Sequence, residues 1–189
     1  QDLLTTFARQ AAMAITNTRQ HENLERKIGN LRILSDSGQQ LTRGLVKRQD
    51  EILELLYQSA TKLQMDTRNM YIAFYEPDPD QPDTAEQVNG KLHFALAYEE
   101  GQPTSMTDRP AMDGLTGVVI SKKESFNPPD VRAVHEQLAV THRRRIPRSW
   151  LGVPMLSEGQ VFGVIVLRDY EHEDTYTKDD EEMLEILAG

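Results

Sequence analysis

The side chains best suited to binding a small molecule are four large aromatic residues on or beside expected strands. Tyrosine and tryptophan combine apolar surface with a polar group, and small-molecule pockets use that combination. Aromatic residues on strands also fill ordinary cores, so a core role stays open for each of them. The four residues are Tyr71, Tyr98, Phe126 and Trp150.

A glycine-flanked segment at residues 114–117 precedes a short expected helix and offers a second place for a ligand. Backbone amides at the start of a helix can hold a phosphate group. The pattern is much weaker than a nucleotide-binding fingerprint, so we favour a turn that supports helix packing. The apolar residues in and beside this segment, Met112, Leu115 and Val119, join the four aromatic residues as candidate ligand contacts.

A run of arginines stands out in an acidic chain. The sequence has 21 Lys and Arg against 30 Asp and Glu, a formal net charge of −9. That charge argues against a nucleic-acid partner, because phosphate backbones need a basic surface. The run could attract an anionic ligand or an acidic neighbour, although a solvated loop explains most such runs. Its members are Arg143, Arg144, Arg145 and Arg148.

The sequence lacks the residue patterns that usually carry out catalysis or bind a metal. The chain has no cysteine, which excludes disulfides, thiolate catalysis and thioether-linked chromophores. The five histidines show no metal-ligand spacing with a carboxylate, and no phosphate-binding loop or nucleophile elbow occurs. We therefore expect a protein that is not an enzyme and that has no catalytic residues and no metal site.

The candidate residues must be positioned by a sheet that is covered on both faces. Apolar runs at residues 149–156 and 161–167, joined by a short polar link, predict a hairpin buried on both sides. Residues 70–75 and 91–98 predict two further strands, and residues 125–127 a short edge strand. The acidic, proline-rich linker after the first of these strands predicts a solvated loop, and residues 99–112 look irregular.

Helical patterns flank the expected strands. Thr177 is a suitable N-cap for a final helix, and Asp130 for one running to Val140. Leucines between residues 24 and 45 form a short, interrupted heptad pattern, which favours a coiled coil over a helix packed on its own domain. The other expected helices span residues 50–63 and 118–122.

The order of these elements and motifs resembles that of a GAF domain. The resemblance is carried by Gly114-Leu115-Thr116-Gly117, Ser149-Trp150-Leu151-Gly152-Val153-Pro154-Met155 and Val161-Phe162-Gly163-Val164-Ile165. It is closest to sensory GAF domains of bacterial histidine kinases and nucleotide cyclases. It implies an α+β fold of the GAF/PAS type: a six-stranded antiparallel sheet with long N- and C-terminal helices on one face, and short helices and loops over a pocket on the other. We assign residues 1–30 to a signalling helix or the end of a preceding module, and residues 31–189 to the GAF domain.

Departures from the family motifs limit which cofactors this domain is expected to bind. Cyclic-nucleotide-binding GAF domains carry Asn-Lys, followed by a Phe and an Asp-Glu pair. Tyr176, Asp180 and Glu181 resemble the second half, but Asp169-Tyr170 stands in place of Asn-Lys, so a cyclic nucleotide is not expected. The absence of cysteine excludes a covalently bound bilin and the methionine-sulfoxide reductase chemistry of this fold. The cofactor is otherwise unknown.

The resemblance implies a non-enzymatic, small-molecule-sensing regulatory domain of a multidomain signalling protein, such as a two-component histidine kinase. Its terminal helices would relay the ligand state to an output domain in the same chain. The alternative is a ligand-free dimerisation scaffold, suggested by the heptad pattern. We expect a homodimer through residues 1–47, no nucleic-acid partner and no membrane contact. The sequence has no apolar run of membrane-spanning length and no signal peptide, so a cytoplasmic protein is expected.

Overall fold

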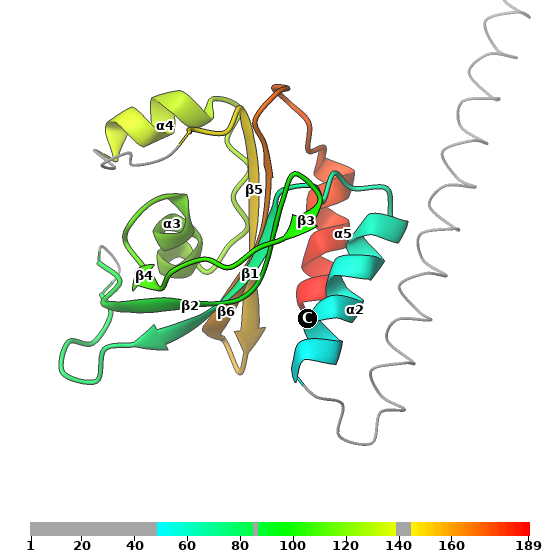
Figure 1. The fold of residues 1–189 in the computed structure, drawn as a ribbon. Helices are drawn as coiled ribbons and strands as arrows, with labels where there is room; N and C mark the ends of the chain where they lie inside the picture. The colour runs from blue at the N-terminus through cyan, green and yellow to red at the C-terminus, as the bar shows by residue number, and fades with distance from the viewer. Residues whose placement is uncertain (1–48, 85–86, 139–144) are drawn as a thin grey trace, which may run out of the picture. The chain divides into compact units, whose positions relative to one another are not determined.

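A six-stranded antiparallel sheet forms the centre of the computed structural model, which describes residues 49–84, 87–138 and 145–189 (Figure 1). The strand order is β3-β2-β1-β6-β5, and β4 pairs with β2 beside this path. The α+β fold class predicted from the sequence is confirmed. The strands are β1 (Met70–Pro77), β2 (Gly90–Glu99), β3 (Gln102–Pro103), β4 (Arg109–Pro110), β5 (Ser149–Ser157) and β6 (Gln160–Asp169).

Helices cover both faces of this sheet. The helices α2 (Gln49–Lys62) and α5 (Lys178–Ala188) lie side by side on one face, and α3 (Leu115–Lys122) and α4 (Val131–Gln137) lie over the other (Figure 1). Every residue from Ser149 to Met155 in β5 is buried, and so is every residue from Gly163 to Leu167 in β6. The predicted hairpin is therefore sandwiched between two helical layers, as its apolar runs require.

Local sequence explains how the hairpin turns and where α5 begins. Ser157 pairs with Gln160, and the two turn residues between them, Glu158 and Gly159, have φ of 53° and 76°. Positive φ at both positions suits the twist of a two-residue hairpin. Thr177 caps α5 as predicted: its hydroxyl accepts from the Asp180 amide, while the Asp180 carboxylate accepts from the Thr177 amide.

Four expected elements differ from the structure in extent. The helix expected at residues 118–122 begins earlier, at Leu115. The segment expected to be irregular, residues 99–112, contains β3 and β4. The expected edge strand at residues 125–127 is a single bridge from Phe126 to Gly152, because two prolines follow it and lack the amide hydrogen that a ladder needs. Asp130 caps α4 as predicted, but the helix ends at Gln137. Residues 139 and 140 of the expected helix lie outside the described residues.

The loop between β1 and β2 joins a hairpin and is mostly exposed where it is described, as predicted, but it is also anchored to the core. The buried Tyr75 hydroxyl donates to the Asp83 carboxylate at 2.6 Å, and the Asn89 amide donates to the same carboxylate at 2.7 Å. Val88 is only 3 % exposed. Burial, together with the bond to Asp83, raises the pKa of Tyr75, so this hydroxyl keeps its proton and remains a donor.

The expected signalling helix at residues 1–30, the heptad pattern and the first part of the proposed 31–189 domain lie outside the described residues, so these assignments stay predictions. Within the described residues, no helix is both long enough and apolar enough to cross a membrane.

Candidate functional site

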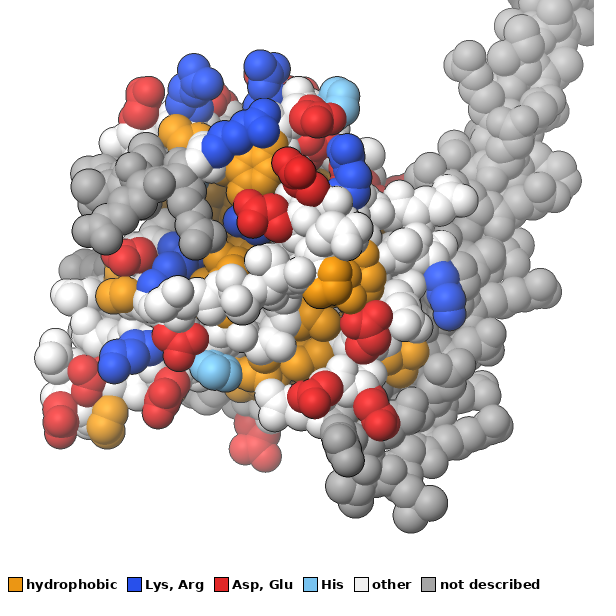
Figure 2. All heavy atoms as spheres, viewed as in Figure 1, with side chains coloured by type: hydrophobic (Ala, Val, Ile, Leu, Met, Phe, Trp, Pro, Cys, Tyr) orange, Lys and Arg blue, Asp and Glu red, His pale blue; other side chains and the backbone are white. Residues whose placement is uncertain are grey.

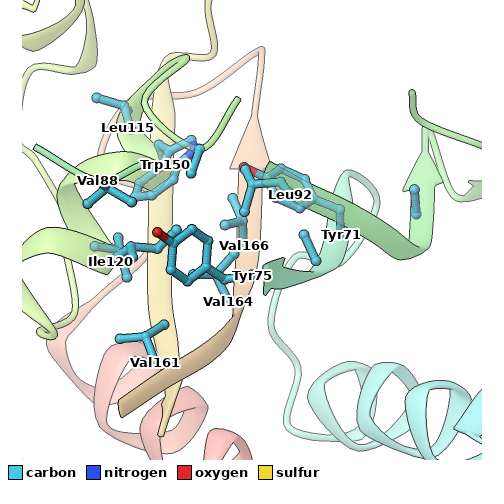
Figure 3. Close-up of a cluster of buried hydrophobic side chains, with 14 of the residues drawn as sticks. Tyr71, Tyr75, Val88, Leu92, Leu115, Ile120, Trp150, Val161, Val164 and Val166 are labelled. Carbon is cyan, nitrogen blue, oxygen red and sulfur yellow. The ribbon is translucent and has the colours of Figure 1, made fainter. Parts of the chain in front are cut away.

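The sheet face beneath α3 carries a cluster of buried side chains drawn from the sheet and from the short helices. Figure 3 shows Leu115 and Ile120 of α3 on the same side of the sheet as Trp150. Strand register explains the sheet's contribution, because residues opposite each other share a face: Tyr71 lies opposite Val166, and Ala73 opposite Val164. The cluster is the part of the core from which a ligand site on this face would be built.

Trp150 is the second residue of β5, and its large ring restricts which residues can lie beside it. The side chain is 4 % exposed, and its ring meets the Phe126 ring edge to face at a centroid distance of 6.2 Å. A Cβ added at Gly152 would overlap the Trp150 ring, because residues two apart on a strand share a face. Gly152 is therefore the residue that lets the indole lie flat along the strand.

A buried hydrogen bond ties the sheet to α3. The Tyr71 hydroxyl and the Thr116 hydroxyl are 2.8 Å apart, and both side chains are almost completely buried. The glycines that flank Thr116 serve close packing: Gly114 has φ of 115°, and a Cβ on Gly117 would lie 2.9 Å from the Ala111 carbonyl oxygen. Leu115, Thr116 and Gly117 thus form the first turn of α3 rather than a turn before it, and the two glycines fit the packing role that the sequence favoured over a phosphate cradle.

Removing this hydrogen bond tests how far it stabilises the site. We expect Tyr71→Phe to lower the free energy of unfolding by about 1–2 kcal/mol, because the Thr116 hydroxyl keeps its burial but loses its partner. Urea denaturation followed by circular dichroism measures the change. The Tyr71→Phe/Thr116→Val double variant should lose less than the two single variants together. Strictly additive losses would show that the two hydroxyls do not interact.

Two arginines, Arg168 on β6 and Arg109 on β4, lie beside the aromatic residues of this sheet face. Arg168 lies opposite Trp150 in the β5–β6 register, and its guanidinium carbon is 5.1 Å from the centre of the Tyr71 ring. Arg109 lies opposite Leu92, and its guanidinium carbon is 5.6 Å from the centre of the Phe94 ring. The Nε atoms of both arginines are buried and have no hydrogen-bond partner within the described residues. These groups supply positive charge at an otherwise apolar face.

Sequence reasoning missed both arginines as site residues. A usable pattern existed for Arg168, which follows Val164 and Val166 at the two-residue spacing of one strand face. Arg109 belongs to a two-residue strand whose sequence, Arg-Pro, does not predict a strand.

The comparisons with known proteins identify the fold family. A family model described as a GAF domain matches residues 47–189, about three quarters of the chain. The chain belongs to the GAF domain family. GAF domains are signalling and sensory modules that are generally regulatory and ligand-binding. No curated protein matches this chain by sequence.

Solved structures support this GAF assignment at the level of the fold. The GAF domain of a phosphoenolpyruvate-protein phosphotransferase (ptsP) from Coxiella burnetii is 18% identical, covers 85% of this chain and 89% of its own, and has a TM-score of 0.61. The corresponding Acinetobacter GAF domain is 17% identical, with coverage of 84% and 87% and a TM-score of 0.54. A type II free methionine-R-sulfoxide reductase from Thermoplasma acidophilum is 19% identical, with coverage of 73% and 90% and a TM-score of 0.53. The fold therefore occurs in an enzyme as well as in GAF domains of larger proteins.

Most of the predicted ligand contacts meet on one face of this GAF domain. Tyr71, Leu115, Val119 and Trp150 belong to the buried cluster, and Phe126 packs against it. Met112 is 44 % exposed and lies beside Gly117 at the start of α3. Their contact with a ligand stays a prediction.

Tyr98 lies on the opposite face of the GAF sheet, against α2. Its ring stacks on the Tyr57 ring at a centroid distance of 3.8 Å, and its hydroxyl donates to Glu54 at 3.0 Å. Burial and this hydrogen bond raise the pKa of Tyr98 to about 12, so the hydroxyl stays protonated at neutral pH. The structure separates Tyr98 from the other candidate residues.

Only part of the arginine run lies within the described residues of the GAF domain. Arg143 and Arg144 lie outside the described residues. Arg145 donates to the Tyr170 carbonyl oxygen at 3.0 Å, and its guanidinium carbon is 5.3 Å from the Tyr170 ring centre. Arg148 is exposed and lies 3.8 Å from the Glu173 carboxylate. The described part of the run is thus divided between an aromatic contact and a surface ion pair.

The residues that resemble half of the cyclic-nucleotide motif have structural partners in this GAF domain. Tyr176 is buried and donates to the Asp66 carbonyl oxygen at 3.2 Å, while Asp180 caps α5. Glu181 accepts from Lys178. Because the chain has no cysteine, it has no thiol to which a bilin could be attached. No metal-binding group of His, Asp and Glu residues occurs in the described segments.

Proposed function

We propose that this GAF domain is a non-enzymatic small-molecule sensor in a multidomain signalling protein. In this proposal a ligand binds on the α3 side of the sheet, and the terminal helices pass its effect to an output domain in the same chain. The observation that carries the proposal is the position of two adjacent residues on β6. Arg168 faces the α3 side, whereas the next side chain, Asp169, holds the loop that leads into α5.

The contacts of Asp169 support the proposed relay from β6 to α5. Its carboxylate is 2 % exposed and accepts from the Glu171 amide at 2.7 Å and from the Thr175 hydroxyl at 2.9 Å. Thr175 comes two residues before the N-cap of α5. A shift of β6 that follows ligand contact at Arg168 would therefore move the start of α5. A ligand changes the position of α5 only through a difference in affinity for two conformations.

A two-stage experiment tests sensing and relay separately. Thermal-shift screening of a metabolite library first identifies stabilising ligands. Because the chain lacks cysteine, spin labels can then be attached at Glu51→Cys in α2 and Glu182→Cys in α5, two exposed positions. We expect a stabilising ligand to change the distance distribution between the labels, whereas a compound that does not stabilise the domain leaves it unchanged. A bound ligand that leaves the distribution unchanged would contradict the relay.

A ligand-free dimerisation scaffold is the second candidate, and exposed apolar residues on the terminal helices favour it. Ile186 on α5 is 57 % exposed, and Ile52 on α2 is 37 % exposed. Analytical ultracentrifugation of the full chain and of Ile186→Glu tests this candidate. The scaffold predicts a dimer that the substitution weakens, and a monomer at high protein concentration would exclude it.

A further inference from the structure

Two half-buried arginines on the α3 face of the sheet each have a buried Nε atom without an acceptor among the described residues. We infer that the ligand of this site carries an anionic group, a carboxylate or a phosphate, which binds to Arg168 with help from Arg109. This inference rests on the proposed sensory function and specifies its ligand class.

We infer an anion because of the hydrogen-bond donors along one edge of the Arg168 guanidinium. A guanidinium binds a carboxylate or phosphate through two parallel donors, and Nε together with one Nη forms one such pair. The Nε atom of Arg168 is buried, and no acceptor within the described residues reaches it. A buried donor without an acceptor is costly, so a ligand oxygen at this position would satisfy it.

The aromatic contacts of Arg168 hold the guanidinium without neutralising it. Its carbon lies 5.1 Å from the Tyr71 ring centre and 5.6 Å from the Tyr170 ring centre. Aromatic faces stabilise a cation but add no negative charge, so the full positive charge remains available to a ligand.

Arg109 continues this arrangement along the sheet. The Tyr71 and Phe94 rings meet edge to face at 5.3 Å, and the Arg109 guanidinium carbon lies 5.6 Å from the Phe94 ring centre. Arg109 donates through Nη1 to the Asp113 carbonyl oxygen, while its buried Nε has no partner in the described part of the chain. The two arginines thus lie at the two ends of one pair of contacting aromatic rings.

The contacts of these two arginines differ from those of Arg68 and Arg148, which have carboxylate partners. With 30 Asp and Glu residues available, Arg68 pairs with Asp66 at 2.7 Å and Arg148 with Glu173 at 3.8 Å. Among the described residues, no carboxylate forms an ion pair with Arg168 or Arg109. Figure 2 shows Lys and Arg side chains close to hydrophobic surface at the end of the molecule where α4 lies, with acidic side chains beside them.

Matched pairs of small probes test the inference by thermal shift and calorimetry. Benzoate is compared with neutral benzamide, and inorganic phosphate and succinate with sodium chloride at the same ionic strength. We expect at least one anion to raise Tm by about 5–10 °C at about 100-fold excess over its Kd. Selective stabilisation by phosphate would point to a phosphorylated ligand, and selective stabilisation by benzoate or succinate to a carboxylic acid.

Arginine variants test whether the anion binds at Arg168. Arg168→Gln should weaken anion binding by about tenfold or more, because charge-assisted hydrogen bonds are lost. Arg168→Lys retains the charge but not the paired donors, and should give an intermediate affinity. Arg148→Gln removes an arginine just before β5 that has an acidic partner, and should bind as the unaltered chain does. Circular dichroism and Tm without probe show whether each variant is folded.

The outcomes separate this inference from the proposed function. The inference is overturned if the anions stabilise no more than sodium chloride does, or if Arg168→Gln binds them fully. If a neutral compound from the screen stabilises the unaltered chain and Arg168→Gln equally, the sensor proposal stands and the anion inference fails. If no compound of any charge binds, both fail.

Discussion

Replacing Trp150 with alanine is expected to lower the free energy of unfolding by about 3–5 kcal/mol. The indole is 4 % exposed and lies against the Gly152 backbone and the Phe126 ring. The loss is large because β5 is hydrogen-bonded to β6 along its length and cannot collapse into the space that the indole leaves. Urea denaturation followed by circular dichroism measures the change.

A second large side chain on the same hairpin provides the matched control. Phe162 on β6 is 41 % exposed, so Phe162→Ala should cost less than about 1 kcal/mol. If Trp150→Ala cost no more than Phe162→Ala, the indole would not be a core residue. Trp150 is also the only tryptophan in the chain, so its fluorescence reports binding at this face without a label.

The central hairpin was predictable because its sequence leaves few alternatives. Residues 149–156 and 161–167 are apolar at successive positions, and a strand of that kind must be covered on both sides. The cap of α5 was predictable for a similar local reason, since Thr177 and Asp180 have the types and spacing of a capping box.

The position of Tyr98 was not predictable, because it depends on a bulge. Leu92 and Phe94 contribute to the site face, and strict alternation would place Tyr98 on that face as well. The structure pairs Ile72 with Leu96 but Ala73 with Phe94, so Ala95 is an extra residue. The extra residue reverses the alternation and turns Tyr98 toward α2. No residue type near Ala95 predicts this.

The loop between β1 and β2 shows a second limit of sequence reasoning. Its prolines and acidic residues correctly predict a break between strands. They do not reveal that Asp83 accepts from the buried Tyr75 hydroxyl, because that contact depends on where the strand places the tyrosine. Arg168 is the reverse case: its two-residue spacing from Val166 predicts which face of the strand it lies on, but an arginine at that position does not by itself indicate a ligand contact.

Replacing Asp169 with asparagine is expected to lower the free energy of unfolding by about 2–3 kcal/mol near neutral pH, because hydrogen bonds to a buried charged acceptor are lost. The Asp169 carboxylate accepts from the amides of Glu171 and His172 and from the Thr175 hydroxyl. Asparagine keeps the shape but replaces one accepting oxygen with a donor that faces other donors. The segment that joins β6 to α5 should therefore loosen, which hydrogen exchange of residues 170–176 can measure.

The pH dependence of this loss follows from the pKa of Asp169. Burial alone would raise this pKa, but the bonds from the Glu171 amide, the Thr175 hydroxyl and His172 outweigh it and hold the pKa below its ordinary value. The charged form is thus favoured in the folded state, so its stabilisation is complete above about pH 4 and is lost as the pH falls through the lowered folded value. The difference between the unaltered chain and Asp169→Asn should shrink over that acidic range.

Glu171 provides the control for both effects, because its side chain is exposed and only its amide contacts Asp169. Glu171→Gln should change the free energy of unfolding by less than about 0.5 kcal/mol and leave its acid dependence nearly unaltered. If the two variants behaved alike, Asp169 would not be the anchor of the β6–α5 connection. If Asp169→Asn bound the ligand normally but no longer moved the label on α5, binding on the Arg168 side and response on the helix side would be joined through this carboxylate.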